Sequence, residues 1–189
     1  MSDLEINDNT PQTVKKIAAQ LWRVGWAGFW LQLVLAVVST LIFLFAAPSA
    51  MMGVSNPGTG GSLIFSLVGL CLLYVSTFWS FRYVVTSRKL KNPDIRPKRV
   101  DTIKLVQWGL TSSIAGMGTS VMGAESIAGT LLGKSLSSMS LGLFNPEAFR
   151  NIIQPLDIFI VLANTHTITA HFIGIVSALW LLTKLNKQG

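Results

Sequence analysis

Four long stretches of apolar residues, separated by polar connectors, organise the chain. They cover residues 24–47, 63–85, 105–132 and 158–182. Each is long enough to cross a bilayer as a helix, which takes about 20 residues. The third stretch is less apolar than the others and rich in Gly, Ser and Ala. The pattern predicts an all-α membrane protein, with four transmembrane helices in a single domain over residues 24–185.

A shorter pattern precedes the first stretch, within the N-terminal segment 1–23. Apolar residues recur there at helical spacing, at Val14, Ile17, Ala18, Leu21 and Trp22. The basic residues Lys15, Lys16 and Arg23 fall elsewhere around such a helix. This arrangement is typical of a short amphipathic helix lying at the membrane surface, and we expect one to lead into the first span.

The polar connectors predict two outer loops, at 48–62 and 134–156, and one basic loop at 86–104. The first outer loop is uncharged and rich in turn-forming residues. In the second, Asn145 as helix N-cap, Pro146 at the first helical position and Glu147 in the first turn predict a short helix on the outer membrane surface.

The charges support the membrane assignment and give it an orientation. Only 12% of the residues are charged, and none lies between Val24 and Phe81, whereas soluble domains carry about 25%. Of the 15 Lys and Arg, all but Lys134 and Arg150 fall at the two termini or around the basic loop. The positive-inside rule therefore places both termini and the basic loop on the cytoplasmic side. The net charge of +7 reflects this topology, so no nucleic acid is expected as a partner.

The basic loop has two interpretations. It could bind anionic lipid headgroups or a partner protein, or it could only set the orientation of the chain. Its candidate contact residues are Arg88, Lys89, Lys91, Arg96, Lys98 and Arg99.

Several function classes find no support in the sequence. No nucleophile with a base and an orienting group is recognisable, so we do not expect an enzyme. No phosphate-binding motif for ATP is present. The single cysteine, Cys71, lies in an apolar run and is expected to be a buried apolar residue. The acidic N-terminus resembles neither a secretory signal nor a transit peptide.

The third stretch combines small residues with one acid. Ser112 and Gly116, and Gly129 and Gly133, are spaced four residues apart, which in membranes lets helix backbones approach closely. Glu125 is the acidic residue of this stretch. A charge at the bilayer centre costs about 2.5–3.5 kcal/mol on insertion scales. We expect Glu125 in the outer third of the membrane, either reaching headgroup water or lining a polar pathway.

The fourth stretch carries both histidines. Asn164, Thr167 and His171 share one helical stripe, whereas His166 lies about 140° away from His171 around the helix. The two histidines therefore cannot chelate a metal ion from this helix alone, and His166 with Glu125 is the best candidate pair. The candidate metal ligands are His171, His166 and Glu125. Three roles remain open: hydrogen bonds that hold the helices together, a divalent cation pathway, or axial ligation of haem or chlorophyll by His171.

Several motifs, taken in order, resemble a known family. They are R-V-G-W-A-G-F-W-L-Q-L-V in the first stretch, V-S-T-F-W-S-F-R-Y in the second, and R-V-D-T-I-K and G-M-G-T-S-V-M-G in the third. The last is L-D-I-F-I-V-L-A-N-T-H-T-I-T-A-H-F in the fourth. The chain thereby resembles the plastid inner-envelope permease family, also described as a component of the inner-envelope protein translocon (Tic). The resemblance runs from about Arg23 to the C-terminus.

This resemblance implies a four-span protein involved in iron uptake or, alternatively, in protein import. A second interpretation, a non-transporting assembly factor or an accessory subunit of a photosynthetic complex, stays open. His171 falls on a histidine of the family pattern and Asp157 on its aspartate, so both join the candidate pathway residues. His166 and Glu125 stand where the plant pattern has asparagine and glutamine. Without a transit peptide, the chain looks like a cyanobacterial member in the plasma or thylakoid membrane. Four spans are few for an alternating-access carrier, so we expect a homo-oligomer or a subunit of a larger membrane complex, with iron as substrate.

Overall fold

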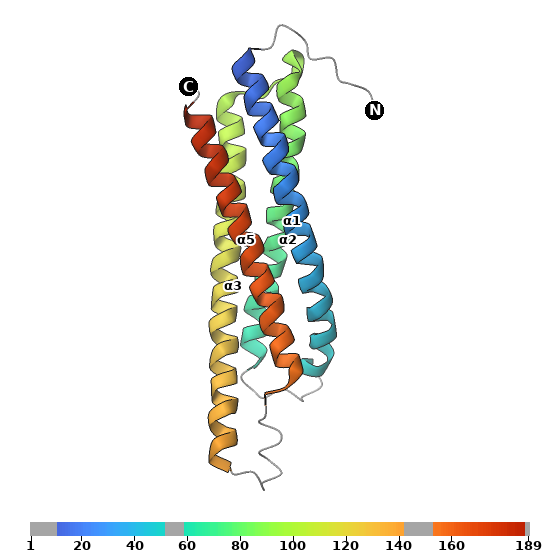
Figure 1. Cartoon of the computed structure of the whole chain (residues 1–189), viewed down its shortest axis with the longest axis vertical. Helices are drawn as coiled ribbons and strands as arrows, with labels where there is room; N and C mark the ends of the chain where they lie inside the picture. The colour runs from blue at the N-terminus through green and yellow to red at the C-terminus, as the bar shows by residue number, and fades with distance from the viewer. Residues whose placement is uncertain (1–10, 52–58, 142–152, 188–189) are drawn as a thin grey trace.

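The structure, a computed structural model, describes residues 11–51, 59–141 and 153–187, which form a bundle of four long helices (Figure 1). These are α1 (Gln12–Met51), α2 (Thr59–Lys91), α3 (Arg99–Leu141) and α5 (Pro155–Lys187). A short 3₁₀ helix, η1 (Pro93–Ile95), lies between α2 and α3. The described residues form no β-strand, so the all-α prediction is confirmed for them.

Successive helices run antiparallel, and two apolar clusters fix the ends of the bundle. The start of α1, the end of α2, the start of α3 and the end of α5 meet in one cluster (Figure 1). Its members are Ala18, Leu21, Tyr83, Leu90, Val106, Ala178, Leu181 and Leu185. The cluster at the opposite end comprises Ala36, Phe43, Leu70, Leu73, Ile127, Ile160, Ala163 and Ala170. Arg99 Nη2 also donates to the carbonyl of Leu185 over 2.7 Å, which ties α3 to α5 at the first end.

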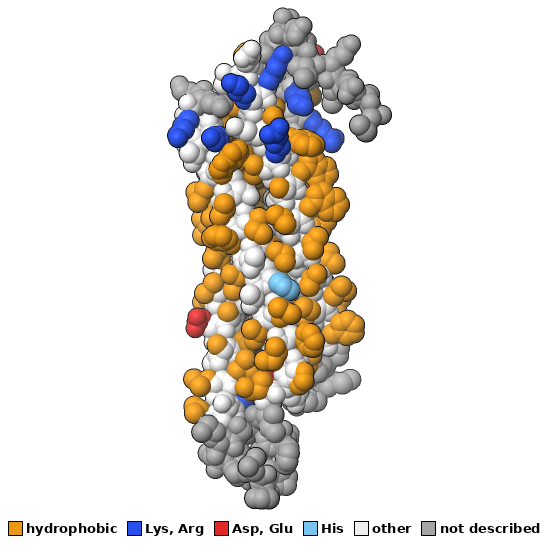
Figure 2. Space-filling model, viewed as in Figure 1, with side chains coloured by type: hydrophobic (Ala, Val, Ile, Leu, Met, Phe, Trp, Pro, Cys, Tyr) orange, Lys and Arg blue, Asp and Glu red, His pale blue; other side chains and the backbone are white. Residues whose placement is uncertain are grey.

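The surface of the bundle is that of a membrane protein. Large apolar side chains point outward along its length, among them Phe45, 81% exposed, and Leu44, 64% exposed. Figure 2 shows hydrophobic side chains over most of the visible face and Lys and Arg side chains gathered at one end. Among the described residues, three helical segments are long and apolar enough to cross a membrane: Gln12–Phe45, Leu63–Lys91 and Pro155–Lys187. The helix α3, with its many Gly, Ser and Thr residues, is not among them.

The expected N-terminal surface helix is not a separate element. Its residues form the first turns of α1, which continues without interruption into the apolar stretch. Ala18 and Leu21 are fully buried in the cluster that contains Leu181 and Leu185. The amphipathic pattern therefore reflects packing within the bundle, against the cluster formed with α2, α3 and α5, because a helix that covers a neighbour and one that covers a membrane surface need the same periodicity.

The helices also extend beyond the apolar stretches, so the predicted loop bounds were too wide. The basic loop 86–104 is mostly helical, since α2 ends at Lys91 and α3 begins at Arg99. Likewise α1 reaches Met51 and α3 reaches Leu141, well inside the outer loops predicted at 48–62 and 134–156. The length of an apolar stretch reflects the thickness of the hydrocarbon core of the membrane. The backbone hydrogen bonds of a helix can continue beyond that core. The short helix predicted at Asn145, Pro146 and Glu147 lies outside the described residues.

Candidate functional site

The interior of the bundle is polar between its two apolar clusters. Each of the four long helices contributes at least one buried polar side chain there. Gln32 comes from α1, Ser76 and Ser80 from α2, Ser113 from α3 and His171 from α5, and none is more than 4% exposed. We call these five residues the polar layer.

Gln32 is the hub of the polar layer. Its Nε2 donates to Ser76 Oγ over 3.0 Å and to the carbonyl of Ala170 over 3.2 Å. Its Oε1 accepts from Ser80 Oγ over 2.9 Å. Ser76 Oγ and Ser113 Oγ lie 2.7 Å apart, so one continuous set of hydrogen bonds joins all four helices.

His171 is fully buried and is held from two sides. Its Nε2 lies 3.1 Å from the carbonyl oxygen of Gly69, so Nε2 carries the proton and donates. On another side the ring rests against Gly116, where an added Cβ would sit 2.8 Å from Nδ1 and nearer still to Cε1 and Nε2. Ligation of haem or chlorophyll through Nε2 would require His171 to leave Gly69.

Asn164 and Thr167 extend the same stripe of α5, and all three stripe residues face the bundle interior. Asn164 is 2% exposed and Thr167 is 0% exposed. Asn164 Nδ2 donates to the carbonyl of Ser120 over 3.0 Å, whereas its Oδ1 is buried without a partner. Ser66 Oγ, which like Asn164 Oδ1 lies close to where a Cβ of Gly123 would be, also has no partner among the described residues. The stripe read from the sequence is therefore an interior, helix-joining face.

Glu125 lies outside the polar layer, on the exposed side of α3. It borders a cleft of about 310 Å³ between α3 and α5. The walls include Glu125, Ala128 and Leu131 from α3 and Val161, Asn164 and Thr165 from α5. His166 is half-buried, and within the described residues no hydrogen bond or ion pair joins it to Glu125. The cleft instead brings Glu125 together with Asn164.

The three candidate metal ligands do not form one group. Across the described segments, no three His, Cys, Asp or Glu side chains lie close enough together to hold a metal ion. His171 points inward to Gly69, His166 lies about 140° away around the same helix, and Glu125 is exposed. An ion held by any of them would need further ligands of another kind, such as amide, hydroxyl or carbonyl oxygens, or ligands from outside the described residues.

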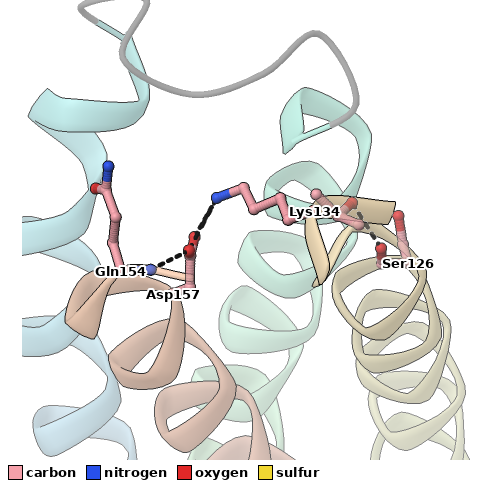
Figure 3. Close-up of polar contacts among 5 residues, drawn as sticks. Ser126, Lys134, Gln154 and Asp157 are labelled. Carbon is pink, nitrogen blue, oxygen red and sulfur yellow. Dashed lines mark hydrogen bonds and ion pairs between the residues drawn. The ribbon is translucent and has the colours of Figure 1, made fainter. Parts of the chain in front are cut away.

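Asp157 forms a buried ion pair with Lys134 (Figure 3). Lys134 Nζ donates to both carboxylate oxygens, over 2.9 and 2.8 Å, and the side chains are only 7% and 14% exposed. The backbone N–H of Gln154 donates to the same carboxylate over 2.9 Å. The sequence analysis assigned Lys134 to the second outer loop and missed this pair. Lys134 and Asp157 lie at the two ends of that connector. The ion pair joins α3 to the start of α5.

The small-residue pairs of α3 differ in what they contact. Gly116 packs against the His171 ring, and Ser112 is half-buried with a partnerless Oγ. Gly129 and Gly133 instead face open space, with nothing within 4 Å of an added Cβ. The second pair therefore packs against no helix of the described chain.

The candidate contact residues of the basic loop stay near the surface. Arg88, Lys89, Lys91, Lys98 and Arg99 are exposed. Arg96 is half-buried and donates through Nε to the carbonyl of Leu90 over 3.2 Å. These residues are available to lipid headgroups or a partner, apart from the bonds that Arg96 and Arg99 make to the bundle.

The polar layer itself was missed by sequence reasoning except for His171. A usable signal was present, because Gln32 is the only amide in the apolar stretch 24–47. Ser76 and Ser80 are also spaced four residues apart, on one helical face. Isolated serines are common in membrane helices and give no such indication alone.

We expect Gln32→Leu to lower the free energy of unfolding by about 1–3 kcal/mol, because it removes the bonds to Ser76 and Ser80 and leaves the buried Ser80 Oγ without its acceptor. The measurement is reversible unfolding in mixed detergent micelles. The matched control is Gln107→Leu, at an exposed position of α3, which should leave stability nearly unchanged. Equal stability of the two variants would contradict a role for Gln32 as the hub.

Comparison with known proteins agrees with the resemblance seen in the motifs. The chain is 30% identical over 175 residues to "Protein TIC 21, chloroplastic" of Arabidopsis thaliana, which covers 89% of this chain. The alignment spans 57% of that relative, so the chain corresponds to little more than half of its length. No solved structure matches. Residues 11–186 match the family DUF3611, described as a protein of unknown function. Since that match covers nearly the whole described chain, the chain belongs to the DUF3611 family.

Proposed function

We propose that this chain is a four-span membrane protein that helps iron or a related divalent cation across its membrane, and that the cation passes between chains. The observation that carries this proposal is the contrast between the inside and the outside of the bundle. Inside the bundle, the side chains of Gln32 and the three serines hydrogen-bond to one another. Glu125 instead lies on the outer side of α3 beside a cleft.

The fourth span in this proposal is α3. It lies beside both α2 and α5 and contributes Val106 to one apolar cluster and Ile127 to the other. A helix that shares both clusters with three apolar spans enters the membrane with them. The positive-inside rule then places the Lys- and Arg-rich end, with both ends of the described chain, on the cytoplasmic side.

A path through one bundle would have to break the polar layer. Gln32 and His171 are both fully buried, and their hydrogen bonds join α1, α2 and α5. An ion on the bundle axis would displace these bonds, each worth about 0.5–1.5 kcal/mol net, and the layer offers no carboxylate in return. A path at the helix surface avoids that cost.

The cleft beside Glu125 has the chemistry that a weakly held divalent cation needs. The carboxylate residue Glu125 borders it, and so does the amide residue Asn164. Oxygen ligands suit hard divalent ions, and their binding is weak enough for release. An ionisable group facing the interior of a membrane is by default a functional candidate. Resemblance to the inner-envelope permease family supports iron as the cargo.

The decisive experiment is radioiron flux into liposomes that contain only this chain. We expect uptake above that of empty liposomes, and a several-fold slower uptake for Glu125→Gln, which keeps the shape and removes the charge. The control is Asp101→Asn, an exposed acid at the basic end of α3, which should leave uptake unchanged. Uptake equal to that of empty liposomes would end the proposal for the isolated chain.

A second candidate is a translocon, assembly or accessory subunit without transport activity. The sealed polar layer and the exposed basic residues at one end favour it, because both suit a scaffold that docks a partner. It predicts no iron flux, together with loss of complex assembly when Arg88, Lys89 and Lys91 are replaced by Gln. A pigment that copurifies with the chain and is lost in His171→Ala would place it in a photosynthetic complex.

A further inference from the structure

We propose that a collar of four cations around the bundle binds the headgroups of anionic phospholipids in the surrounding bilayer. The collar consists of Arg23 from α1, Arg82 from α2, Lys104 from α3 and Lys184 from α5. The inference goes beyond transport, because it names the lipid that the chain selects around itself. It rests on the proposed function only in counting α3 among the membrane spans.

The four collar cations lie at one level of the bundle. One apolar cluster contains a residue from each long helix at this level: Leu21, Tyr83, Val106 and Leu181. Each collar cation is within three residues of the cluster member on its own helix, a distance of about 5 Å along a helix. Residues far apart in the sequence therefore form one belt of positive charge around the molecule.

The collar cations point away from the bundle interior. Arg23, Arg82 and Lys104 are exposed, and Lys184 is half-buried. Within the described residues none of the four forms an ion pair. Because each long helix contributes one cation, the positive charge is not confined to one side of the bundle. A docked protein would cover one side, whereas lipid surrounds every helix, so the arrangement favours lipid as the occupant.

Two of the collar cations rest on aromatic rings that lie one turn nearer the membrane centre. The Arg82 guanidinium is 6.0 Å from the centroid of the Phe78 ring. The Lys184 ammonium is 5.4 Å from the centroid of the Trp180 ring. Such a cation–π contact keeps a long side chain at the lipid-facing surface while leaving its N–H groups free to donate. Phosphate oxygens are strong acceptors for those groups.

The tryptophans mark the same level independently. All six tryptophans of the chain lie in the half of the bundle that holds the collar. Trp108, 62% exposed, is four residues from Lys104 toward the membrane centre. On α1, Trp26 stacks on Trp30 with 6.0 Å between their centroids. Tryptophan concentrates at the headgroup level of a membrane, so the collar lies at the depth of lipid phosphates.

The charge of this end of the bundle selects for anionic lipid. Apart from Lys134, every Lys and Arg of the described residues lies here (Figure 2), whereas the described acids at this end are Asp94 and Asp101. Lys134, at the opposite end, is neutralised by Asp157. An anionic leaflet is attracted by such a cluster, whereas a zwitterionic headgroup carries no net charge. Setting the orientation of the chain would need charge at this end, but not one outward cation on each helix.

Fluorescence of the six tryptophans gives a direct test. The full chain is reconstituted in phosphatidylcholine bilayers that hold a small fraction of a brominated lipid, which quenches nearby tryptophans. We expect brominated phosphatidylglycerol to quench several-fold more, at equal mole fraction, than brominated phosphatidylcholine. The difference should shrink at high salt, because exposed charges are screened. Equal quenching by the two lipids would overturn the proposal, and the collar would then be open to a partner protein.

Two variants of equal charge separate the collar from net charge alone. Replacing all four collar cations by Gln should abolish the preference for phosphatidylglycerol at unchanged helix content. The matched control replaces by Gln four exposed cations further from the membrane centre: Arg88, Lys89, Lys91 and Lys187. The control should keep most of the preference. If it lost as much as the collar variant, the proposal would be overturned, since any cation at this end would then serve.

Single substitutions at Arg82 keep the test open if the fourfold variant does not fold. Arg82→Lys keeps the charge and should retain more of the preference than Arg82→Gln. Equal preference in the two would contradict the part assigned to Arg82. Neither measurement involves transport. Preference for anionic lipid without iron flux would sustain the collar and end the proposed transport by the isolated chain, whereas flux without that preference would do the reverse.

Discussion

Gly116→Ala should lower the free energy of unfolding by about 2–6 kcal/mol, although it adds one methyl group. The new Cβ would overlap three atoms of the His171 ring, and overpacking of this kind costs about 1–3 kcal/mol. To escape, the ring must leave the Gly69 carbonyl to which it is bonded. The buried Nε2–H of His171 then loses its acceptor, which costs a further ~1–3 kcal/mol, whereas the Gly69 carbonyl keeps its bond within α2. The measurement is reversible unfolding in detergent, at a concentration where the chain is monomeric.

The control for this prediction is Gly118→Ala, two residues further along the same helix. Its Cβ would meet nothing within 4 Å, so it should be neutral or stabilise α3 by about 0.5–1 kcal/mol. Adding His171→Ala to Gly116→Ala should recover part of the loss, because it removes the atoms that overlap. If Gly116→Ala were as stable as Gly118→Ala, the His171 ring would not rest on Gly116.

The helices and their membrane character could be predicted because they depend on local pattern. Each apolar stretch became the central part of a long helix, and the α5 stripe of Asn164, Thr167 and His171 follows from helical periodicity alone. The ends of the helices could not be predicted in the same way. Nothing in the apolar run indicates that α3 continues past Lys134 to Leu141, because the helix no longer needs apolar residues there.

The candidate site was predictable in part, for a related reason. Periodicity shows which residues share a face, but it does not show what that face meets. Gly116 and Gly129 look alike in the sequence, yet one contacts His171 and the other faces outward. The pairing of Gln32 with Ser76 and Ser80 joins residues more than 40 positions apart, which only the packing of α1 on α2 decides.

The second large effect is expected at the ion pair between Lys134 and Asp157. Lys134→Met should cost about 3–5 kcal/mol of unfolding free energy, because it leaves the Asp157 carboxylate buried without its cation. Both side chains are less than one sixth exposed, so solvent cannot replace the lost partner. The matched control is Lys104→Met, at an exposed position near the opposite end of α3, which should change stability by less than about 0.5 kcal/mol.

The double variant Lys134→Met/Asp157→Asn separates the two roles of Asp157. The amide removes the buried charge but keeps an oxygen that can accept from the Gln154 N–H, as the carboxylate does over 2.9 Å. Replacing a buried pair by neutral groups is often close to neutral, whereas removing one partner is not. We therefore expect the double variant to recover most of the stability that Lys134→Met loses. If it were as unstable as Lys134→Met, the loss would come from the lysine stem packing between α3 and α5, and the ion pair would contribute little to joining them.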